Sequence, residues 1–258
     1  MSNPITRRTT RAGDLSEATI ATYRRDGFVR VARVLDERRT ARFAAAALSA
    51  RERLSDHNEG HAVFAQLLQL WQHDDVLREL TLDPELARMA TALAGVPLRL
   101  WHDQLLIKDP RNGARTEYHQ DNPYWPHAPN RHALSAWVAL VDVPVERGCM
   151  TFIPGQQDAY RNLRPQDLED GDDLFGLAPE LRYAPRHTLP LRAGDCTFHH
   201  SFTPHTANAN ETDDPRIAQV VIYVDRDTRF VELGHPVTDG LGLAPGDRLP
   251  DDAFPPLP

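Results

Sequence analysis

Apolar and polar positions follow a helical spacing before Gly95 and a strand-like alternation after it. In the first part, Ser16 and Asp36 stand where helix N-caps are expected, and Asp26-Gly27 interrupts the first helix. Residues 28–34 alternate apolar and polar side chains, which is typical of a strand. The pattern therefore predicts one early strand and four helices, over residues 15–25, 38–54, 62–72 and 84–94.

Short β-like runs separated by Gly, Pro, Asn and Asp fill the part of the chain after Gly95. Strands are predicted over residues 98–107, 133–141, 150–153, 186–191, 195–200 and 217–224. Evenly spaced short strands favour a barrel or a sandwich. Because the helices precede the strands, we expect an α+β fold in which the N-terminal helices brace the outside of the strands.

The chain shows no internal repeat and no long linker, so we expect a single domain over residues 15–258. Residues 1–14 contain Arg7, Arg8 and Arg11 among threonines and no hydrophobic body, which favours a flexible tail over a transit peptide. Residues 165–185 are acidic and punctuated by Gly and Pro. A segment of this kind is either a lid over a binding site or a plain surface excursion.

Composition narrows the class of protein. Of 258 residues, 41% are hydrophobic and 26% charged, as in an ordinary globular protein. The net charge of -8 argues against a nucleic-acid partner. No apolar run approaches the ~20 residues of a membrane helix, so no membrane association is expected. Cys149 and Cys196 make no disulfide framework, and without a secretory signal the cytoplasm is the expected compartment.

The chemistry-bearing segment with the clearest spacing is His119-Gln120-Asp121. On a strand, side chains two residues apart point to the same face. One imidazole and one carboxylate side by side supply two ligands of a facial metal triad, which leaves coordination positions open for substrates. By itself the H-x-D pattern is equally compatible with an ordinary His–Asp hydrogen bond.

A second polar segment follows about 80 residues later and contains His199, His200 and His205. His199 and His200 are adjacent, so only one of them can face the interior of a strand pair. Eleven residues beyond His205 lies Arg216, at the start of another predicted strand. A guanidinium there can hold a carboxylate through two parallel hydrogen bonds. The alternative is a surface ion pair of Arg216 with the preceding acidic residues.

With these motifs, the chain resembles the phytanoyl-CoA dioxygenase family of Fe(II)- and 2-oxoglutarate-dependent oxygenases. The resemblance extends from about Leu15 to the Pro-rich C-terminus and is densest in five ordered blocks, residues 104–110, 119–125, 134–140, 147–155 and 194–223. It implies a double-stranded β-helix, also called a cupin-type or jelly-roll barrel.

Carried over by position, the resemblance makes His119, Asp121 and His205 the iron ligands. It favours His205 over His199 and His200 because the eleven-residue spacing along the sequence from His205 to Arg216 matches that of the family. Arg216 would bind the distal carboxylate of 2-oxoglutarate. The remaining candidates are Lys108, Trp137 and Gln104 for the co-substrate, and Trp125, Tyr118, Phe202 and His200 for the substrate.

Three positions depart from the family pattern, the first of them Arg147, which precedes Gly148 where Asn-Gly is usual. Tyr118 replaces a tryptophan that often precedes the first ligand, and Ala207 stands where a small hydroxyl residue helps to hold the co-substrate. Several candidates also have ordinary alternatives: Trp137 as a core residue, Lys108 as a surface charge, and His127 and His132 as loop residues at the surface.

The resemblance implies an oxygenase that consumes 2-oxoglutarate and O2, hydroxylates a small metabolite or natural-product intermediate, and releases succinate and CO2. The Asp121 carboxylate favours hydroxylation over halogenation. Two alternatives use the same residues: a cupin-type metalloenzyme that does not need 2-oxoglutarate, and a catalytically inactive binding protein on the same scaffold. Arg216 distinguishes the first alternative, because metal chemistry without 2-oxoglutarate does not require it.

Overall fold

The computed structural model describes residues 15–54, 64–129, 131–166 and 174–258. The tail predicted over residues 1–14 lies outside this range. The helices are α1 (Glu17–Asp26), α2 (Glu37–Arg53), α3 (Leu70–His73), α4 (Asp75–Thr81), α5 (Pro84–Ala94) and α6 (Leu174–Leu177). Short 3-10 turns are η2 (Asn122–Tyr124), η3 (Val145–Arg147) and η4 (Pro179–Tyr183).

The longer helices begin and end where local chemistry dictates. Ser16 accepts a hydrogen bond from the backbone N–H of Thr19, and Asp36 accepts one from that of Arg39, as the N-cap predictions require. Helix α1 ends at Gly27, whose φ of 82° lies in the left-handed region that favours glycine. These caps confirm the helices predicted over residues 15–25 and 38–54 to within two residues.

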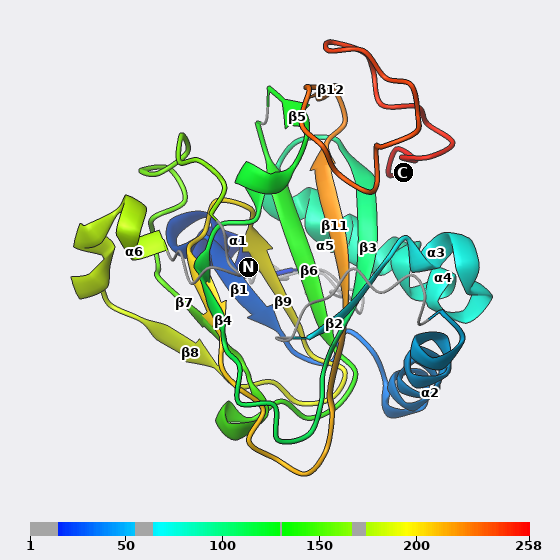
Figure 1. Ribbon diagram of the computed structural model, residues 1–258, viewed down its shortest axis with the longest axis vertical. Helices are drawn as coiled ribbons and strands as arrows, with labels where there is room; N and C mark the ends of the chain where they lie inside the picture. Colours follow the sequence, from blue (N-terminus) through cyan, green and yellow to red (C-terminus); the bar gives the residue numbers. More distant parts are fainter. Residues whose placement is uncertain (1–14, 55–63, 130, 167–173) are drawn as a thin grey trace, which may run out of the picture.

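The strands form two larger antiparallel sheets and one small pair (Figure 1). A six-stranded sheet has the order β1-β9-β6-β11-β3-β2, and a four-stranded sheet has the order β4-β10-β7-β8. The bounds of the first sheet are β1 (Phe28–Val31), β9 (Cys196–His200), β6 (Ala133–Ala139), β11 (Arg216–Asp225), β3 (Leu98–Lys108) and β2 (Ala65–Leu68). Those of the second are β4 (Thr116–His119), β10 (His205–Ala207), β7 (Met150–Phe152) and β8 (His187–Leu189). The pair joins β5 (His127–Ala128) to β12 (Arg229–Phe230).

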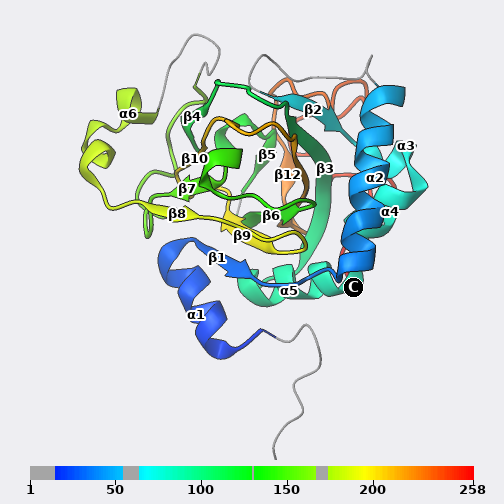
Figure 2. The same ribbon diagram turned by 90° about the horizontal axis from the view of Figure 1, so that it is seen from below.

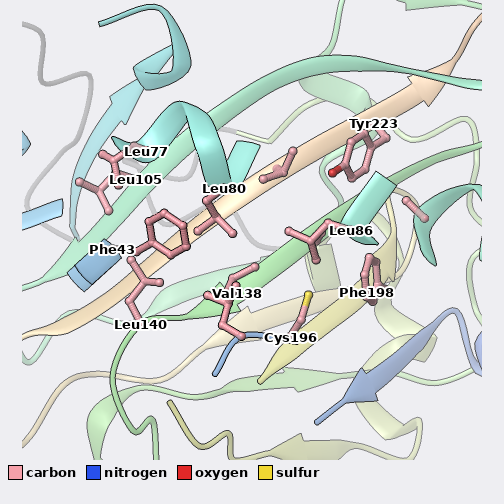
Figure 3. Close-up of a cluster of buried hydrophobic side chains, with 14 of the residues drawn as sticks. Phe43, Leu77, Leu80, Leu86, Leu105, Val138, Leu140, Cys196, Phe198 and Tyr223 are labelled. Carbon is pink, nitrogen blue, oxygen red and sulfur yellow. The ribbon is translucent and has the colours of Figure 1, made fainter. Parts of the chain in front are cut away.

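The six-stranded sheet buries both of its faces. On β6, Leu134, Ala136 and Val138 belong to the core on the helix side, whereas Trp137 and Ala139 belong to the core on the opposite side. Helices α2, α4 and α5 cover the first face, where their side chains interdigitate with those of the sheet (Figures 2 and 3). The four-stranded sheet lies across the second face (Figure 2). The inward-pointing residues of β3, β6, β9 and β11 therefore lie between the two sheets.

One predicted helix is wrong. Of residues 62–72, those within the described range form β2, paired with β3, and only then α3. Gln69 between them has a φ of 59°, which separates the two elements. The periodicity of a short apolar run does not distinguish a strand from a helix. Here residues 65–68 form a strand because they pair with the otherwise free edge of β3. Helix α4, capped by the Asp74 side chain, was not predicted.

The α+β class is confirmed, with helices packed outside the larger sheet as expected, and the strands pair antiparallel. Among the described strands, the pairing leaves the six-stranded and four-stranded sheets as separate units and closes no barrel. The described helices include none that is both long and apolar enough to cross a membrane.

Candidate metal centre

His119 and His205 face each other across two neighbouring strands. They are direct partners in the register of β4 and β10, and their ring centroids are 4.3 Å apart. The Nδ1 atom of His119 lies 2.8 Å from the carbonyl oxygen of Glu117, and that of His205 lies 3.0 Å from the carbonyl oxygen of Thr203. Because a carbonyl oxygen only accepts, both Nδ1 atoms carry the proton. Each Nε2 therefore keeps its lone pair for a metal ion.

Asp121 reaches the same point from a turn and not from a strand. Strand β4 ends at His119, and Asp121 has the helical angles φ -73° and ψ -42°. Its backbone N–H donates to the carbonyl oxygen of Ser201 at 2.9 Å, which fixes the turn against the segment after β9. One carboxylate oxygen, Oδ1, lies 3.6 Å from the Nε2 atoms of both His119 and His205. His119 and Asp121 thus point to the same site as expected, but Asp121 does so from a turn and not from the predicted strand.

The second carboxylate oxygen of Asp121 has its own supports. The Ser135 hydroxyl donates to Oδ2 at 3.0 Å, and the Nε2 atom of His199 lies 3.3 Å from it. Burial by itself raises the pKa of the Asp121 carboxyl, but His205, His119 and His199 lower it, and the resulting pKa lies well below its ordinary value. Asp121 is therefore ionised.

The pKa of the His205 imidazole is lowered to about 3, first by burial and then by the neighbouring His119. A neutral imidazole is the form that binds metal ions. The candidate ligand atoms of His119, Asp121 and His205 all lie within 4.8 Å of one another. Two histidines and one carboxylate on one side of an open space are the donor set that suits iron(II) in non-haem oxygenases.

The three side chains open into a cavity of about 810 Å³ between the two sheets. Of the residues predicted for the co-substrate and substrate, those that line it are Gln104, Trp125, Trp137 and Arg216. His199 also lines it, from the inward face of β9. Arg164, Pro165 and Gln166 border the cavity, so the start of the predicted lid region lies at the site, whereas residues 167–173 are outside the described range.

Arg216 brings a buried positive charge to this cavity. It begins β11, is 2% exposed, and its guanidinium lies 5.4 Å from the centre of the Trp137 ring. Its Nε has no hydrogen-bond partner among the described residues. Burial lowers the pKa of Arg216 to about 10, which leaves the group charged at neutral pH. A buried guanidinium with an unpartnered donor can bind an anion.

Lys108 does not reach the cavity, contrary to its expected role with the co-substrate. Its Nζ donates to the carbonyl oxygens of Ala114, Ala207 and Asn208, at 3.1, 3.3 and 2.9 Å. All three ammonium hydrogens thus have acceptors within the protein. Lys108 is also fully buried, which rules out the surface charge that was the alternative.

Three substrate-side candidates also lie outside the cavity lining. Tyr118 faces away from His119 and packs on Phe175, and Phe202 lies under the guanidinium of Arg161. His200 points to the face of β9 opposite to that of His199 and contacts the His132 ring. Both Tyr118 and His200 directly neighbour an inward-facing residue on a strand, and successive strand residues point to opposite faces. His127 and His132 are partly or fully buried and not surface residues as expected.

The motifs did not reveal several residues of the cavity. Ser135 lies on the inward face of β6, two residues before Trp137, and His102 lies on that of β3, two residues before Gln104. Because side chains two residues apart on a strand point to the same face, Ser135 and His102 could have been predicted from Trp137 and Gln104. His235 comes from an irregular segment after β12 and has no sequence signal.

A family model and a curated relative of this chain both point to the same protein family. The family model described as phytanoyl-CoA dioxygenase matches residues 23–218. Phytanoyl-CoA dioxygenase domain-containing protein 1 of Mus musculus is 28% identical over 202 residues, which cover 77% of this chain and 64% of that protein. The chain thus spans less than two thirds of the length of this relative.

Two solved structures are similar over nearly their whole length. The non-haem alpha ketoglutarate dependent carbocyclase SnoK from nogalamycin biosynthesis has a TM-score of 0.87 at 35% identity, with 96% of this chain and 99% of that chain covered. The epimerase SnoN, in complex with Fe3+, alpha ketoglutarate and nogalamycin RO, has a TM-score of 0.79 at 38% identity, with 94% and 98% covered.

Proposed function

Because the chain belongs to the phytanoyl-CoA dioxygenase family, we propose that it is a non-haem oxygenase that depends on iron(II), 2-oxoglutarate and O2. The observation that carries this proposal is the meeting of the His119, Asp121 and His205 side chains with the buried guanidinium of Arg216 in one cavity. The alpha ketoglutarate dependence of SnoK and the iron in the SnoN complex support the same assignment.

In this proposal the chain's own residues bind and orient the reactants. His119 and His205 would offer their Nε2 lone pairs to the iron, and Asp121 would offer Oδ1 while Ser135 holds Oδ2. Arg216 would bind the distal carboxylate of 2-oxoglutarate, the co-substrate also called alpha ketoglutarate. Iron(II) and 2-oxoglutarate, when bound, supply the oxidising chemistry with O2 and yield succinate and CO2. Trp137, whose ring lies against the Arg216 guanidinium, and Gln104 would contact the co-substrate, and Trp125 would contact the substrate.

We further propose that the substrate is a small natural-product intermediate and that a C–H bond of it is hydroxylated. The cavity volume of about 810 Å³ suits a molecule of that size. SnoK is a carbocyclase and SnoN an epimerase of nogalamycin biosynthesis, so ring formation and epimerisation are the other outcomes to be sought among the products. The two facing antiparallel sheets are, in the same proposal, the two halves of a double-stranded β-helix.

The test is the formation of succinate from 2-oxoglutarate by the purified protein with iron(II) and O2, with and without candidate natural-product substrates. The wild-type protein should form succinate faster when a substrate is present, and the His119→Ala and Asp121→Ala variants should fold but form only background amounts. His73→Gln, at the exposed end of α3, is the matched control and should behave like the wild type. Undiminished succinate formation in either ligand variant would contradict the proposal.

Iron binding without any dependence on 2-oxoglutarate would instead favour a metalloenzyme of another kind. The presence of Arg216, buried and facing the cavity, speaks against that alternative, because such a site would carry the cost of a buried charge without using it.

A further inference from the structure

A second polar cluster in the cavity is formed by two histidines that the metal centre does not use. His102 comes from the inward face of β3, and His235 comes from the segment that follows β12. Both line the cavity, and their ring centroids are 5.5 Å apart. The pair therefore brings two ring nitrogens to a part of the cavity wall that the metal ligands do not supply.

The hydrogen bond of His102 fixes which of its nitrogens carries the proton. Its Nδ1 lies 3.1 Å from the carbonyl oxygen of Asp103, so Nδ1 donates and Nε2 is left as an acceptor. The residue is 2% exposed, and Nε2 has no hydrogen-bond partner among the described residues. Leaving a buried acceptor without a partner is unfavourable, so its presence at a cavity calls for a ligand that donates to it.

His235 has the opposite tautomer. Its Nδ1 accepts a hydrogen bond from the backbone N–H of Val237 at 3.2 Å, so the proton of the neutral ring is on Nε2. The Asp239 carboxylate accepts from the backbone N–H of His235 at 3.1 Å and fixes the segment. Burial lowers the pKa of His102 to about 3 and that of His235 to about 4, so both rings are neutral at pH 7.

An aromatic ring lies beside both histidines. The Trp101 ring lies 5.9 Å from the His102 ring and 5.6 Å from the His235 ring, measured between centroids. Leu68 and Val220 line the same cavity. Neither His102 nor His235 is charged, so a carboxylate or a phosphate would gain one hydrogen bond there and no counter-charge. A hydroxyl group both accepts and donates, and it satisfies one acceptor and one donor together.

We propose that His102 and His235 bind a neutral hydroxyl group of the substrate, with His235 Nε2–H donating to the hydroxyl oxygen and His102 Nε2 accepting the hydroxyl hydrogen. This inference rests on the proposed function, since it concerns the substrate of the same site. Neither histidine is one of the metal ligands, so the recognised hydroxyl is a different group from the C–H bond that is oxidised. It selects substrates and sets their orientation in the cavity.

The test compares two probes that differ only in the O–H group, 2-naphthol and its methyl ether 2-methoxynaphthalene. Their binding to the protein with iron(II) and 2-oxoglutarate is titrated without O2 by ligand-observed NMR. The wild-type protein should bind 2-naphthol roughly 10-fold more tightly, the worth of a pair of well-made hydrogen bonds in a buried site. In His102→Phe and in His235→Phe this ratio should fall to near one, whereas His73→Phe should keep it.

His235 is only partly buried, so its variant remains informative even if His102→Phe does not fold. Tautomers are read independently from the ring-nitrogen shifts of protein labelled with 15N-histidine. Protonated Nδ1 in His102 and protonated Nε2 in His235 support the proposal, and equal tautomers in the two rings overturn it.

The same samples separate this inference from the proposed function. If the iron(II)–2-oxoglutarate charge-transfer absorption forms but the two probes bind equally, the hydroxyl site is wrong and the oxygenase assignment stands. If the absorption fails to form in the wild-type protein while the probe ratio depends on both histidines, the hydroxyl site stands and the oxygenase assignment is wrong.

Discussion

Arg216 and Lys108 are direct partners in the register of β11 and β3, yet only Arg216 lines the cavity. The Nζ of Lys108 donates to three backbone carbonyl oxygens, whereas the Nε of Arg216 has no partner among the described residues. The two neighbouring basic side chains therefore differ in their hydrogen bonding. Arg216 is available to an anionic ligand, and Lys108 joins β3 to the segments around residues 114 and 207.

A steady-state assay of the KM for 2-oxoglutarate should distinguish substitutions of Arg216 from substitutions of Lys108. Arg216→Met should raise the KM for 2-oxoglutarate by at least about 10-fold, because a charge-assisted hydrogen bond contributes roughly 1.5–3 kcal/mol. Lys108→Met should change that KM far less and should lower the melting temperature. A larger KM effect from Lys108→Met than from Arg216→Met would contradict the assignment of Arg216 as the anion-binding residue.

Lys108 should also make the stability of the fold depend on pH. Burial, followed by the charge of Arg216, lowers the pKa of Lys108 to about 7, below its ordinary value of 10.5. Between these two values the unfolded chain binds more protons at this position than the folded protein does. The contribution of Lys108 to the free energy of unfolding is therefore present above the ordinary pKa and is lost as pH falls through about 7.

The measurement is the free energy of unfolding from urea titrations between about pH 6.5 and pH 9.5, for the wild type and for Lys108→Met. The difference between the two proteins should widen in favour of the wild type as pH rises. A difference that is constant over this range, or that narrows with rising pH, would show that Lys108 is not held with a lowered pKa.

Thr116 is expected to supply the hydroxyl that is missing at Ala207. The two residues are partners in the register of β4 and β10, and both line the cavity. The carbonyl oxygen of Ala207 accepts from Lys108, the partner of Arg216, so these residues lie near the end of the cavity that contains Arg216.

Thr116→Val should therefore raise the KM for 2-oxoglutarate by about 5-fold, the value of one hydrogen bond of about 1 kcal/mol. Adding Ala207→Ser to this variant should restore most of the affinity. Unchanged KM in the single variant, or no recovery in the double variant, would exclude a hydroxyl contact from this strand pair.

Ser135 should hold the Asp121 carboxylate in place for iron. Groups that orient a metal ligand typically contribute about 10- to 100-fold to metal affinity, so Ser135→Ala should weaken iron(II) binding by that factor. Ser135→Thr, which keeps the hydroxyl, should retain the affinity, and the exposed Ser49→Ala is the control. Competition with a chromophoric chelator without O2 measures the affinity. Equal affinity in Ser135→Ala and the wild type would mean that His199 alone suffices to position Asp121.

The sequence predicted features that depend on local chemistry. The caps of α1 and α2 depend on residues within a few positions of Ser16 and Asp36, and both helices formed where expected. The grouping of His119, Asp121 and His205 with Arg216 was also anticipated, through a resemblance that fixes their order along the chain. The metal-binding roles of these residues stay predictions until iron is added.

Features that depend on long-range pairing were missed or wrong. Strand β2 forms because it pairs with the edge of β3, and the sequence of residues 62–72 alone contains no information about that partner. Tyr118 neighbours His119, which was already assigned to the site, so the alternation along β4 places it on the other face. For His199 and His200 the sequence indicated that one faces inward but not which one, and the structure places His199 there. His235 enters the cavity from an irregular segment, which carries neither period nor motif.

The most direct measurement on the proposed site is the visible charge-transfer absorption of iron(II) chelated by 2-oxoglutarate, recorded without O2 on the purified protein. The absorption should require both additions and should weaken in Arg216→Met, while His73→Gln keeps it at the wild-type intensity. Iron binding without the absorption at saturating 2-oxoglutarate, or an absorption that is indifferent to Arg216, would contradict the assignment of this cavity as a 2-oxoglutarate-dependent oxygenase site.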